Sequence, residues 1–297
     1  MQKIILYYKF VPVKDPESIV LWQRELCKRL NLKGRIIISE HGINGTLGGD
    51  VANLKEYVKE NNLTLFKGIT YKWSDGGSED FPRLSVKRRP ELVAFGAPEE
   101  IIVNEKGVIG GGKHLKPKQV HKLVEEKNGD VIFFDGRNAY EAKIGKFKDA
   151  VVPDVRTSHD FLKEIEDPKY DSIKEKPIVS YCTGGIRCEA LSVLMKNRGF
   201  KEVYQIDGGI VKYGEEFGDD GLWEGSLYVF DKRMDTTFSD KAKTIGVCIK
   251  CSGKTSNFEN CAYKPCNNLV LMCKDCHAKD DTCTAECHEK LAVYSGK

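Results

Sequence analysis

The stretch Pro177-Ile-Val-Ser-Tyr-Cys-Thr-Gly-Gly-Ile-Arg-Cys188 decides the fold of this chain. The mostly apolar run from Pro177 to Tyr181 is typical of a buried strand, and the glycines after it indicate a tight loop. Apolar residues at helical spacing then continue to a stop at Gly199. A strand that passes through a glycine loop into a helix is a unit of a parallel α/β sheet, whose ligands bind at the carboxyl ends of the strands. Cys182 lies at such an end.

The neighbouring sequence repeats this alternation of strands and helices. The expected elements, in chain order, are a helix face with Val120, Leu123 and Val124, a buried strand at Val131–Asp135, a helix at Phe161–Ile165 and a strand at Glu202–Ile206. Because strands and helices alternate, we predict a parallel-sheet α/β domain over residues 114–217.

The N-terminal part of the chain follows a different pattern. Strand-like stretches occur at Lys3–Phe10, Gly34–Ser39, Ile69–Trp73 and Phe81–Phe95, and helical spacing at Asp15–Leu32 and Asp50–Asn61. This order predicts a small α+β domain with a ferredoxin-like sheet over residues 1–96. Residues 97–113 are rich in glycine and polar side chains and are interpreted as a linker. Residues 218–297 form a cysteine-rich C-terminal region.

Composition limits the class of protein. The chain has 297 residues, of which 40% are hydrophobic and 31% charged, so disordered and fibrous classes are excluded. The apolar runs are far shorter than the roughly 18 residues that a membrane helix needs, and the first residues lack a signal-peptide pattern. We therefore expect a cytoplasmic protein with no membrane partner.

Charge is distributed unevenly along the chain. The formal net charge is +3, too weak to require a nucleic-acid partner. Residues 1–96 hold 16 basic and 11 acidic side chains, whereas residues 97–217 hold 20 and 21. The basic excess therefore lies in the N-terminal domain, where Lys87, Arg88 and Arg89 are candidate phosphate contacts. A solvated charged face is an equally good interpretation of these three.

The loop after Cys182 has the features that stabilise a thiolate. It consists of Thr183, Gly184, Gly185, Ile186 and Arg187. Backbone N–H groups converge at the start of the helix, the glycines let them surround the sulfur, and Arg187 adds a positive charge. We therefore predict that Cys182 is a nucleophile. The six residues from Cys182 to Arg187 are one fewer than in a phosphatase loop, so the spacing favours a persulfide over a phosphocysteine.

A purely structural role is the alternative for both cysteines of this loop. Cys182 is a small buried residue at a strand end, and most free cysteines in that setting only pack. Cys188, just inside the helix, is either a resolving thiol that pairs with Cys182 or another packing residue.

Eight of the eleven cysteines fall in the C-terminal region. They form four closely spaced pairs, Cys248 with Cys251, Cys261 with Cys266, Cys273 with Cys276, and Cys283 with Cys287. Four thiolates bind one zinc ion tetrahedrally, so the eight predict about two structural zinc ions. Consecutive pairing and an interleaved arrangement, with the first pair joined to the third, both fit the spacing. Iron–sulfur clusters and disulfides are the alternatives.

Several motifs of the second domain resemble those of a rhodanese homology domain. They are the Cys182–Arg187 loop, Asp135-Gly-Arg137 with Glu141, and Asp207-Gly-Gly209, within residues 114–213. The resemblance makes Cys188, Asp135 and Arg137 possible accessory residues.

The whole chain is similar to the tRNA uridine hydroxylase family, of the UPF0176 type. The resemblance rests on the domain order and on the stretches Gly34–Gly45, Phe81–Val93 and Trp223–Asp231, although Glu40-His41 departs from the family pattern. Family membership implies oxygen-dependent conversion of the wobble uridine, position 34, of tRNA to 5-hydroxyuridine, with Cys182 as the required thiol. It also implies tRNA as partner, molecular oxygen as co-substrate, and a sulfur-donor protein or small thiol if a persulfide forms.

A sulfurtransferase and a binding module are the alternative functions. A rhodanese-type sulfurtransferase that passes sulfur from a Cys182 persulfide to a thiol acceptor has the same loop chemistry. A zinc-stabilised binding module without activity is disfavoured because the loop keeps its nucleophile. The glycines from Gly42 to Gly49 are not followed by Gly-Lys-Ser/Thr, so we expect no nucleotide cofactor.

Overall fold

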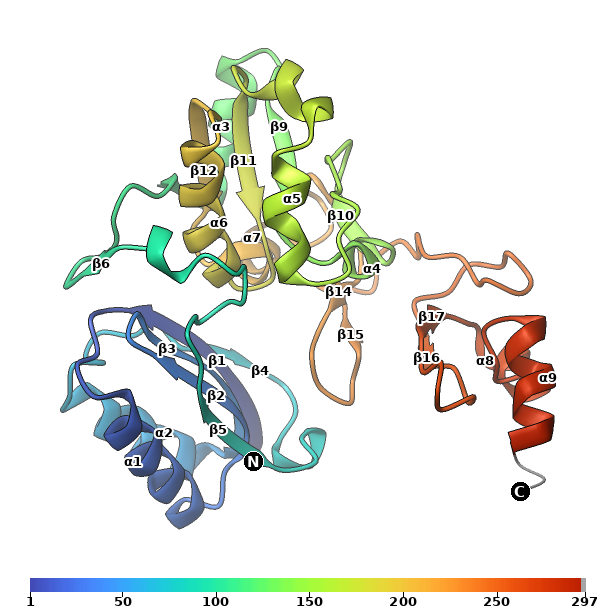
Figure 1. Ribbon diagram of the computed structural model, residues 1–297, viewed down its shortest axis with the longest axis horizontal. Coiled ribbons are helices and arrows are strands. Elements are labelled where there is room, and N and C mark those ends of the chain that lie inside the picture. Colours follow the sequence, from blue (N-terminus) through green and yellow to red (C-terminus); the bar gives the residue numbers. More distant parts are fainter. Residues whose placement is uncertain (295–297) are drawn as a thin grey trace.

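The computed structural model describes residues 1–294 and opens with a five-stranded sheet (Figure 1). Its strands are β1 (Gln2–Phe10), β2 (Lys33–Ser39), β3 (Gly42–Asp50), β4 (Lys72–Ser74) and β5 (Leu84–Arg88), in the order β4-β1-β3-β2-β5. Helices α1 (Pro16–Arg29) and α2 (Val51–Asn62) lie on one side of the sheet. The first four strands have the ferredoxin-like order, as predicted, and β5 joins β2 in parallel.

Strand β3 is the element of the N-terminal sheet that the sequence analysis did not predict, because glycines interrupt its apolar pattern. The structure gives these glycines a packing role. A side chain at Gly45 would come within 2.3 Å of the Tyr7 hydroxyl, which is hydrogen-bonded to Tyr57 beneath the sheet. A side chain at Gly48 would lie 2.2 Å from the Gly77 carbonyl oxygen. Glycine is therefore required where neighbouring groups press on the strand.

The second domain contains a four-stranded parallel sheet of order β8-β12-β11-β9. Its strands are β8 (Lys113–Leu115), β9 (Ile132–Asp135), β11 (Pro177–Tyr181) and β12 (Glu202–Ile206), and its helices are α3 (Pro117–Glu126), α4 (Ala139–Ala142), α5 (Phe161–Ile165), α6 (Ile186–Asn197) and α7 (Gly209–Phe217). The parallel α/β fold is confirmed, including the bounds predicted for α5, β11 and β12.

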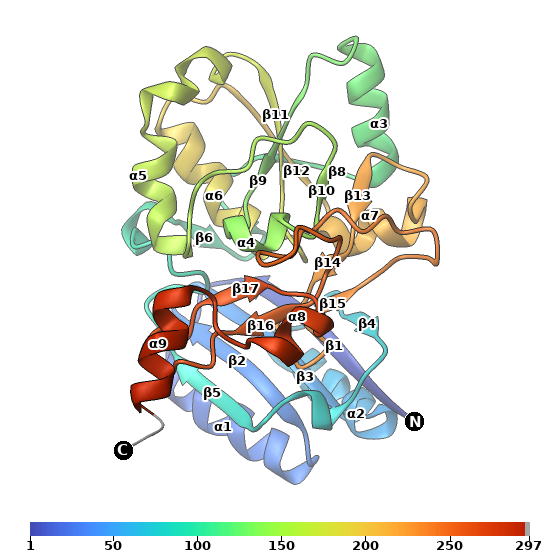
Figure 2. The same ribbon diagram turned by 90° about the vertical axis from the view of Figure 1, so that its right-hand side faces the viewer.

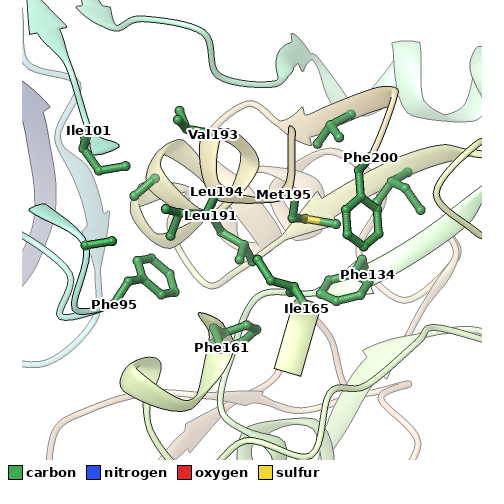
Figure 3. Close-up of a cluster of buried hydrophobic side chains, with 14 of the residues drawn as sticks. Phe95, Ile101, Phe134, Phe161, Ile165, Leu191, Val193, Leu194, Met195 and Phe200 are labelled. Carbon is green, nitrogen blue, oxygen red and sulfur yellow. The ribbon is translucent and has the colours of Figure 1, made fainter. Parts of the chain in front are cut away.

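A hydrophobic core joins the two domains. Around α5 and α6 it buries Phe134, Ile165 and Leu191 (Figure 3). The same core includes Phe10 from β1 and Phe95 from the chain after β5, and the Phe95 ring packs edge-on against Phe161 at 5.7 Å. Because burying one aromatic side chain contributes a few kcal/mol, these contacts hold the N-terminal domain firmly on the second domain.

The remaining elements are short. Residues 97–113 hold the hairpin of β6 (Val103–Asn104) and β7 (Gly107–Val108), and β13 (Trp223–Gly225) returns to pair with β10 (Gly145–Phe147). The C-terminal region adds β14 (Leu227–Tyr228), β15 (Asp235–Thr236), β16 (Phe258–Asn260), β17 (Leu269–Leu271), α8 (Lys274–Lys279) and α9 (Ala285–Tyr294), seen from its own side in Figure 2. The 3-10 helices are η1 (Ser78–Asp80), η2 (Pro98–Glu100), η3 (Ser158–Asp160) and η4 (Pro168–Ile173). Within residues 1–294, every helix is too short or too polar to span a bilayer.

Candidate active site and metal centres

The Cys182 thiol lies between the end of β11 and the start of α6, and it is completely buried. The Gly185 backbone N–H donates a hydrogen bond to Cys182 Sγ at 3.1 Å. Gly185 caps α6 with a φ of +102°, a left-handed conformation that favours glycine. The loop therefore turns an N–H group and the positive end of a helix toward the sulfur.

A second glycine turn holds the carbonyl side of the same loop. The Ile210 N–H donates to the Cys182 carbonyl oxygen at 2.9 Å, and the Val211 N–H donates to the Thr183 carbonyl oxygen at 3.1 Å. Gly209 approaches so closely that a side chain there would come within 2.4 Å of the Cys182 carbonyl oxygen. The start of α7 thus fixes the thiol loop, which explains the Gly208-Gly209 pair after β12.

Arg187 is held in place by a buried carboxylate. Its guanidinium donates to both oxygens of Glu141, at 2.5 and 2.9 Å, and to the Thr183 hydroxyl at 3.1 Å. Glu141 is fully buried, so this bidentate pair leaves Arg187 little freedom.

The surroundings of Cys182 favour its thiolate. Burial alone would oppose the charge, but a hydrogen bond from the Cys188 side chain, the positive charge of Arg187 and the N–H groups of Cys188 and Gly185 outweigh it. Together they hold the pKa of the Cys182 thiol below its ordinary value. Burial and the neighbouring Cys182 charge raise the pKa of Cys188 well above its ordinary value. Of these two neighbouring thiols, Cys182 is therefore the one whose surroundings favour the anion.

Asp135 and Arg137 lie behind the loop and bind each other. The Arg137 guanidinium donates to both Asp135 oxygens, at 2.9 and 2.6 Å, and to the Gly145 carbonyl oxygen at 2.7 Å. Both side chains are fully buried, and Arg137 also lies over the Trp223 ring. This geometry supports a framework role under the strand ends.

The N-terminal domain covers the thiol loop, a contact for which the sequence contains no signal. Lys72 on β4 donates from Nζ to the Gly184 carbonyl oxygen at 2.9 Å, and Lys72 is only 6% exposed. A side chain at Gly184 would meet Leu6 at 2.8 Å, and one at Gly185 would meet the Tyr8 hydroxyl at the same distance. The glycines of the thiol loop therefore pack directly against β1 and β4.

A cavity of about 1040 Å³ lies between the domains beside this contact. Its lining includes Tyr8, Lys72, Glu189 and Gly208, but not Cys182. The Tyr8 hydroxyl donates to Glu189 at 3.1 Å, and His114 Nε2 lies 3.3 Å from the other Glu189 oxygen. Five carboxylates and six lysines line the cavity, so its charge is mixed.

The three candidate phosphate contacts lie on β5 and just after it, outside the cavity lining. Arg88 pairs with Glu17 at 3.3 Å and with Glu40 at 3.4 Å. Lys87 and Arg89 are exposed. The structure thus separates a paired arginine from two side chains that face solvent.

The eight C-terminal cysteines gather into two groups of four. The groups are Cys248, Cys251, Cys273, Cys276 and Cys261, Cys266, Cys283, Cys287, each with its sulfur atoms within 4.8 Å of one another. Among them, the Sγ atoms of Cys251 and Cys273 are 3.8 Å apart and those of Cys266 and Cys283 are 3.6 Å apart. A tetrahedral zinc ion with Zn–S bonds of about 2.3 Å separates its sulfurs by about 3.8 Å. Of the two arrangements left open by the spacing, the structure has the interleaved one, and both donor sets fit zinc.

The fold and the thiol loop define a protein built around a rhodanese-like domain. The rhodanese-like family model matches residues 116–216, the model described as the UPF0176 acylphosphatase like domain matches residues 2–92, and the model described as rhodanase C-terminal matches residues 224–288. Proteins named tRNA uridine(34) hydroxylase are similar over almost the whole chain. The one from Corynebacterium urealyticum is 62% identical and covers 96% of both chains, and the one from Corynebacterium jeikeium is 60% identical and covers 99% of this chain and 96% of its own. The chain belongs to the tRNA uridine(34) hydroxylase family.

Proposed function

We propose that this protein hydroxylates uridine 34 of tRNA to 5-hydroxyuridine, with molecular oxygen as co-substrate and Cys182 as the essential thiolate. The observation that carries the proposal is the thiol loop, in which Gly185, Arg187 and Cys188 all favour the Cys182 anion. Because a thiolate is a far stronger nucleophile than a thiol, this loop suits covalent chemistry on a bound base or sulfur. The likeness to named hydroxylases along nearly the whole chain supports the same reaction.

Different residues of the chain stabilise the thiolate, position its cation and hold the C-terminal region. Arg187 keeps the Cys182 charge, and Glu141 keeps Arg187 in place. Leu6 and Tyr8 contact the loop at Gly184 and Gly185, and the thiol itself is completely buried. The eight cysteines of the C-terminal region would hold two zinc ions, which supply structure and no open position for substrate.

The test is nucleoside mass spectrometry of tRNA from cells that lack the protein and receive either the wild type or Cys182→Ser. The wild type should restore 5-hydroxyuridine and the variant should not, because the hydroxyl of serine stays protonated in this loop. Isotopically labelled dioxygen should place its label in the new hydroxyl group. Restoration by the serine variant would overturn the assignment of Cys182.

A sulfurtransferase is the second candidate, because the short Cys182–Arg187 loop suits a single added sulfur atom. In that reaction the thiolate attacks the outer sulfur of a donor persulfide, carried by a protein or by a small thiol, and the S–S bond that breaks releases the donor as its thiolate. Intact-mass analysis would detect the added sulfur on Cys182. Persulfide formation together with normal 5-hydroxyuridine in cells lacking the protein would favour this alternative.

A further inference from the structure

The two faces of the N-terminal sheet have different neighbours. Ile5, Ile36 and Val86 point to the side of α1 and α2, where they belong to the N-terminal core. Because side chains alternate along a strand, Leu6 and Tyr8 point to the opposite, helix-free face. Both side chains meet the thiol loop, as does Lys72, the register partner of Leu6 on β4, so the helix-free face is the one turned toward the active site. Figure 1 shows α1 and α2 on the far side of the sheet from the second domain.

Strand register places two exposed cations, Arg35 and Lys87, in the rows of this helix-free face that contain Leu6 and Tyr8. Residues paired across a sheet share a face, so each row of partners can be followed from β1 to β5. One row contains Leu6, Thr46, Arg35 and Ser85, and the next contains Tyr8, Asn44, Ile37 and Lys87. Arg35 and Lys87 therefore lie on the same face as Leu6 and Tyr8, which contact the thiol loop. Arg88 follows Lys87 and points to the helix side, as its ion pair with Glu17 of α1 requires.

The positive charge of these rows is not neutralised within the protein. Both Arg35 and Lys87 are exposed, and neither side chain forms an ion pair or hydrogen bond with another residue of the described chain, 1–294. The other six members of the rows carry no charge. Arg88, by contrast, pairs with Glu17 and Glu40. An uncompensated pair of cations on the face that also meets the thiol loop is suited to an anionic substrate.

An exposed aromatic ring lies near the same place. The Phe230 ring is 45% exposed and its centre lies 5.7 Å from the Arg187 guanidinium carbon. It packs edge-on against Tyr228 at 5.1 Å. The hairpin of β14 and β15 is tied to the N-terminal domain, because the Arg233 guanidinium donates to the Asp75 carbonyl oxygen at 2.6 Å. Burial raises the pKa of the Tyr228 phenol, and the Arg35 guanidinium partly offsets that rise. The face therefore combines cations with a ring on which a base can stack.

We propose that the helix-free face of the N-terminal sheet, through Arg35 and Lys87 with Phe230 beside them, binds the single-stranded anticodon loop of the tRNA substrate. The inference rests on the proposed function. Single-stranded RNA is bound by cations that track its phosphates and by aromatic rings that stack its bases, and the face that meets the thiol loop offers both. The interdomain cavity is the rival location, but its five carboxylates repel phosphates about as strongly as its six lysines attract them.

The test compares two double variants of the full-length protein that remove equal charge. Arg35→Gln with Lys87→Gln changes the helix-free face, and Lys55→Gln with Arg88→Gln changes the helix side. Binding of unmodified tRNA is titrated at several salt concentrations. Each lost phosphate contact on a single strand lowers the slope of log affinity against log salt by about 0.7, so the first variant should lose about 1.4 and the second nothing. Phe230→Ala should weaken binding several-fold without changing the slope, because stacking releases no counterions.

The outcomes separate the inference from the function on which it rests. A wild type that forms 5-hydroxyuridine while the helix-free variant binds tRNA with unchanged affinity and slope would overturn the inference and leave the function standing. Equal losses in both double variants would also overturn it, since the effect would then be one of net charge. A wild type that neither binds nor hydroxylates tRNA would end both. Normal intact-mass and melting data for every variant guard against misfolding.

Discussion

Cys182 and Cys261 are both completely buried, yet different kinds of structure hold them. Cys182 lies at the junction of a parallel strand and a helix whose residues belong to two cores of many side chains, and the N-terminal domain contacts its loop. Cys261 lies in a region of short strands whose nearby hydrophobic cluster has four buried members, Ile144, Tyr228, Phe258 and Leu271. The fold positions the first thiol, whereas the second lies in a cysteine group that could hold a metal ion, and so small a core leaves more of the ordering to that group.

Metal removal should have the largest effect, because it should unfold the region around Cys261 and leave the region around Cys182 folded. Binding of a structural zinc ion contributes roughly 10–16 kcal/mol to the order of a small domain, so a strong chelator should unfold residues 246–294. Hydrogen exchange should then become fast there and stay slow in β11 and α6. Metal analysis before chelation should find about two zinc ions per chain. Persistent protection of the cysteine-rich region without metal would contradict the prediction.

Glu141→Gln should have the next largest effect, a loss of unfolding free energy in the domain that holds Cys182. The substitution leaves the buried Arg187 charge without its carboxylate, which costs roughly 3–5 kcal/mol of unfolding free energy. Glu17→Gln, which removes an exposed partner of Arg88, should cost less than about 1 kcal/mol. Chemical denaturation of both variants measures the difference. Equal costs would mean that burial of the Glu141 pair is unimportant.

Arg187→Met should change the pH dependence of the thiol. The pKa of Cys182 lies below its ordinary value partly because of Arg187, so the thiolate forms at lower pH than in an ordinary cysteine. Removing the cation should raise that pKa by about 1–3 pH units, and the thiolate should then appear at higher pH. The ultraviolet absorbance of the thiolate, taken as the difference from Cys182→Ser, reports it. Arg187→Lys keeps the charge and should move the midpoint less.

Lys72→Met should give the smallest shift, in the same direction. Its ammonium hydrogen-bonds to the Gly184 carbonyl oxygen instead of to the sulfur, so its effect on Cys182 is indirect. We expect the pKa of Cys182 to rise by less than about one pH unit, since the cation acts beyond direct contact. Lys55→Met, on an exposed face of α2, is the matched control. A shift as large as that of Arg187→Met would make Lys72 a direct partner of the thiolate.

The local sequence pattern was sufficient to predict the strands at the centre of the second domain. The run Pro177–Tyr181 ends just before the glycine loop, the run Glu202–Ile206 lies between Lys201 and Asp207, and each is a strand with those bounds. The loop after Cys182 was also predictable, since residues adjacent in sequence supply its N–H group and Arg187. Both features depend on residues within one short segment.

The features that the sequence did not predict depend on contacts between segments that are distant in the chain. Strand β3 was not predicted because its glycines weaken a strand pattern, and only Tyr7 and Gly77 explain their presence. The Lys72–Gly184 hydrogen bond joins residues 112 positions apart, and no local signal predicts it. The three consecutive cations Lys87, Arg88 and Arg89 formed one candidate site in the sequence. Strand alternation turns the side chains of Lys87 and Arg88 to opposite faces, which composition alone cannot reveal.

The complete burial of Cys182 has a kinetic consequence. Because Cys182 is completely buried, a reagent or base reaches Sγ only while the structure around the loop opens, so the observed rate is the intrinsic thiolate rate multiplied by the open fraction of the protein. Low thiol pKa and fast labelling are therefore separate properties of this molecule. An acidic thiol that reacts slowly in the resting protein is expected here, and the gap between the two measures the free energy of that opening.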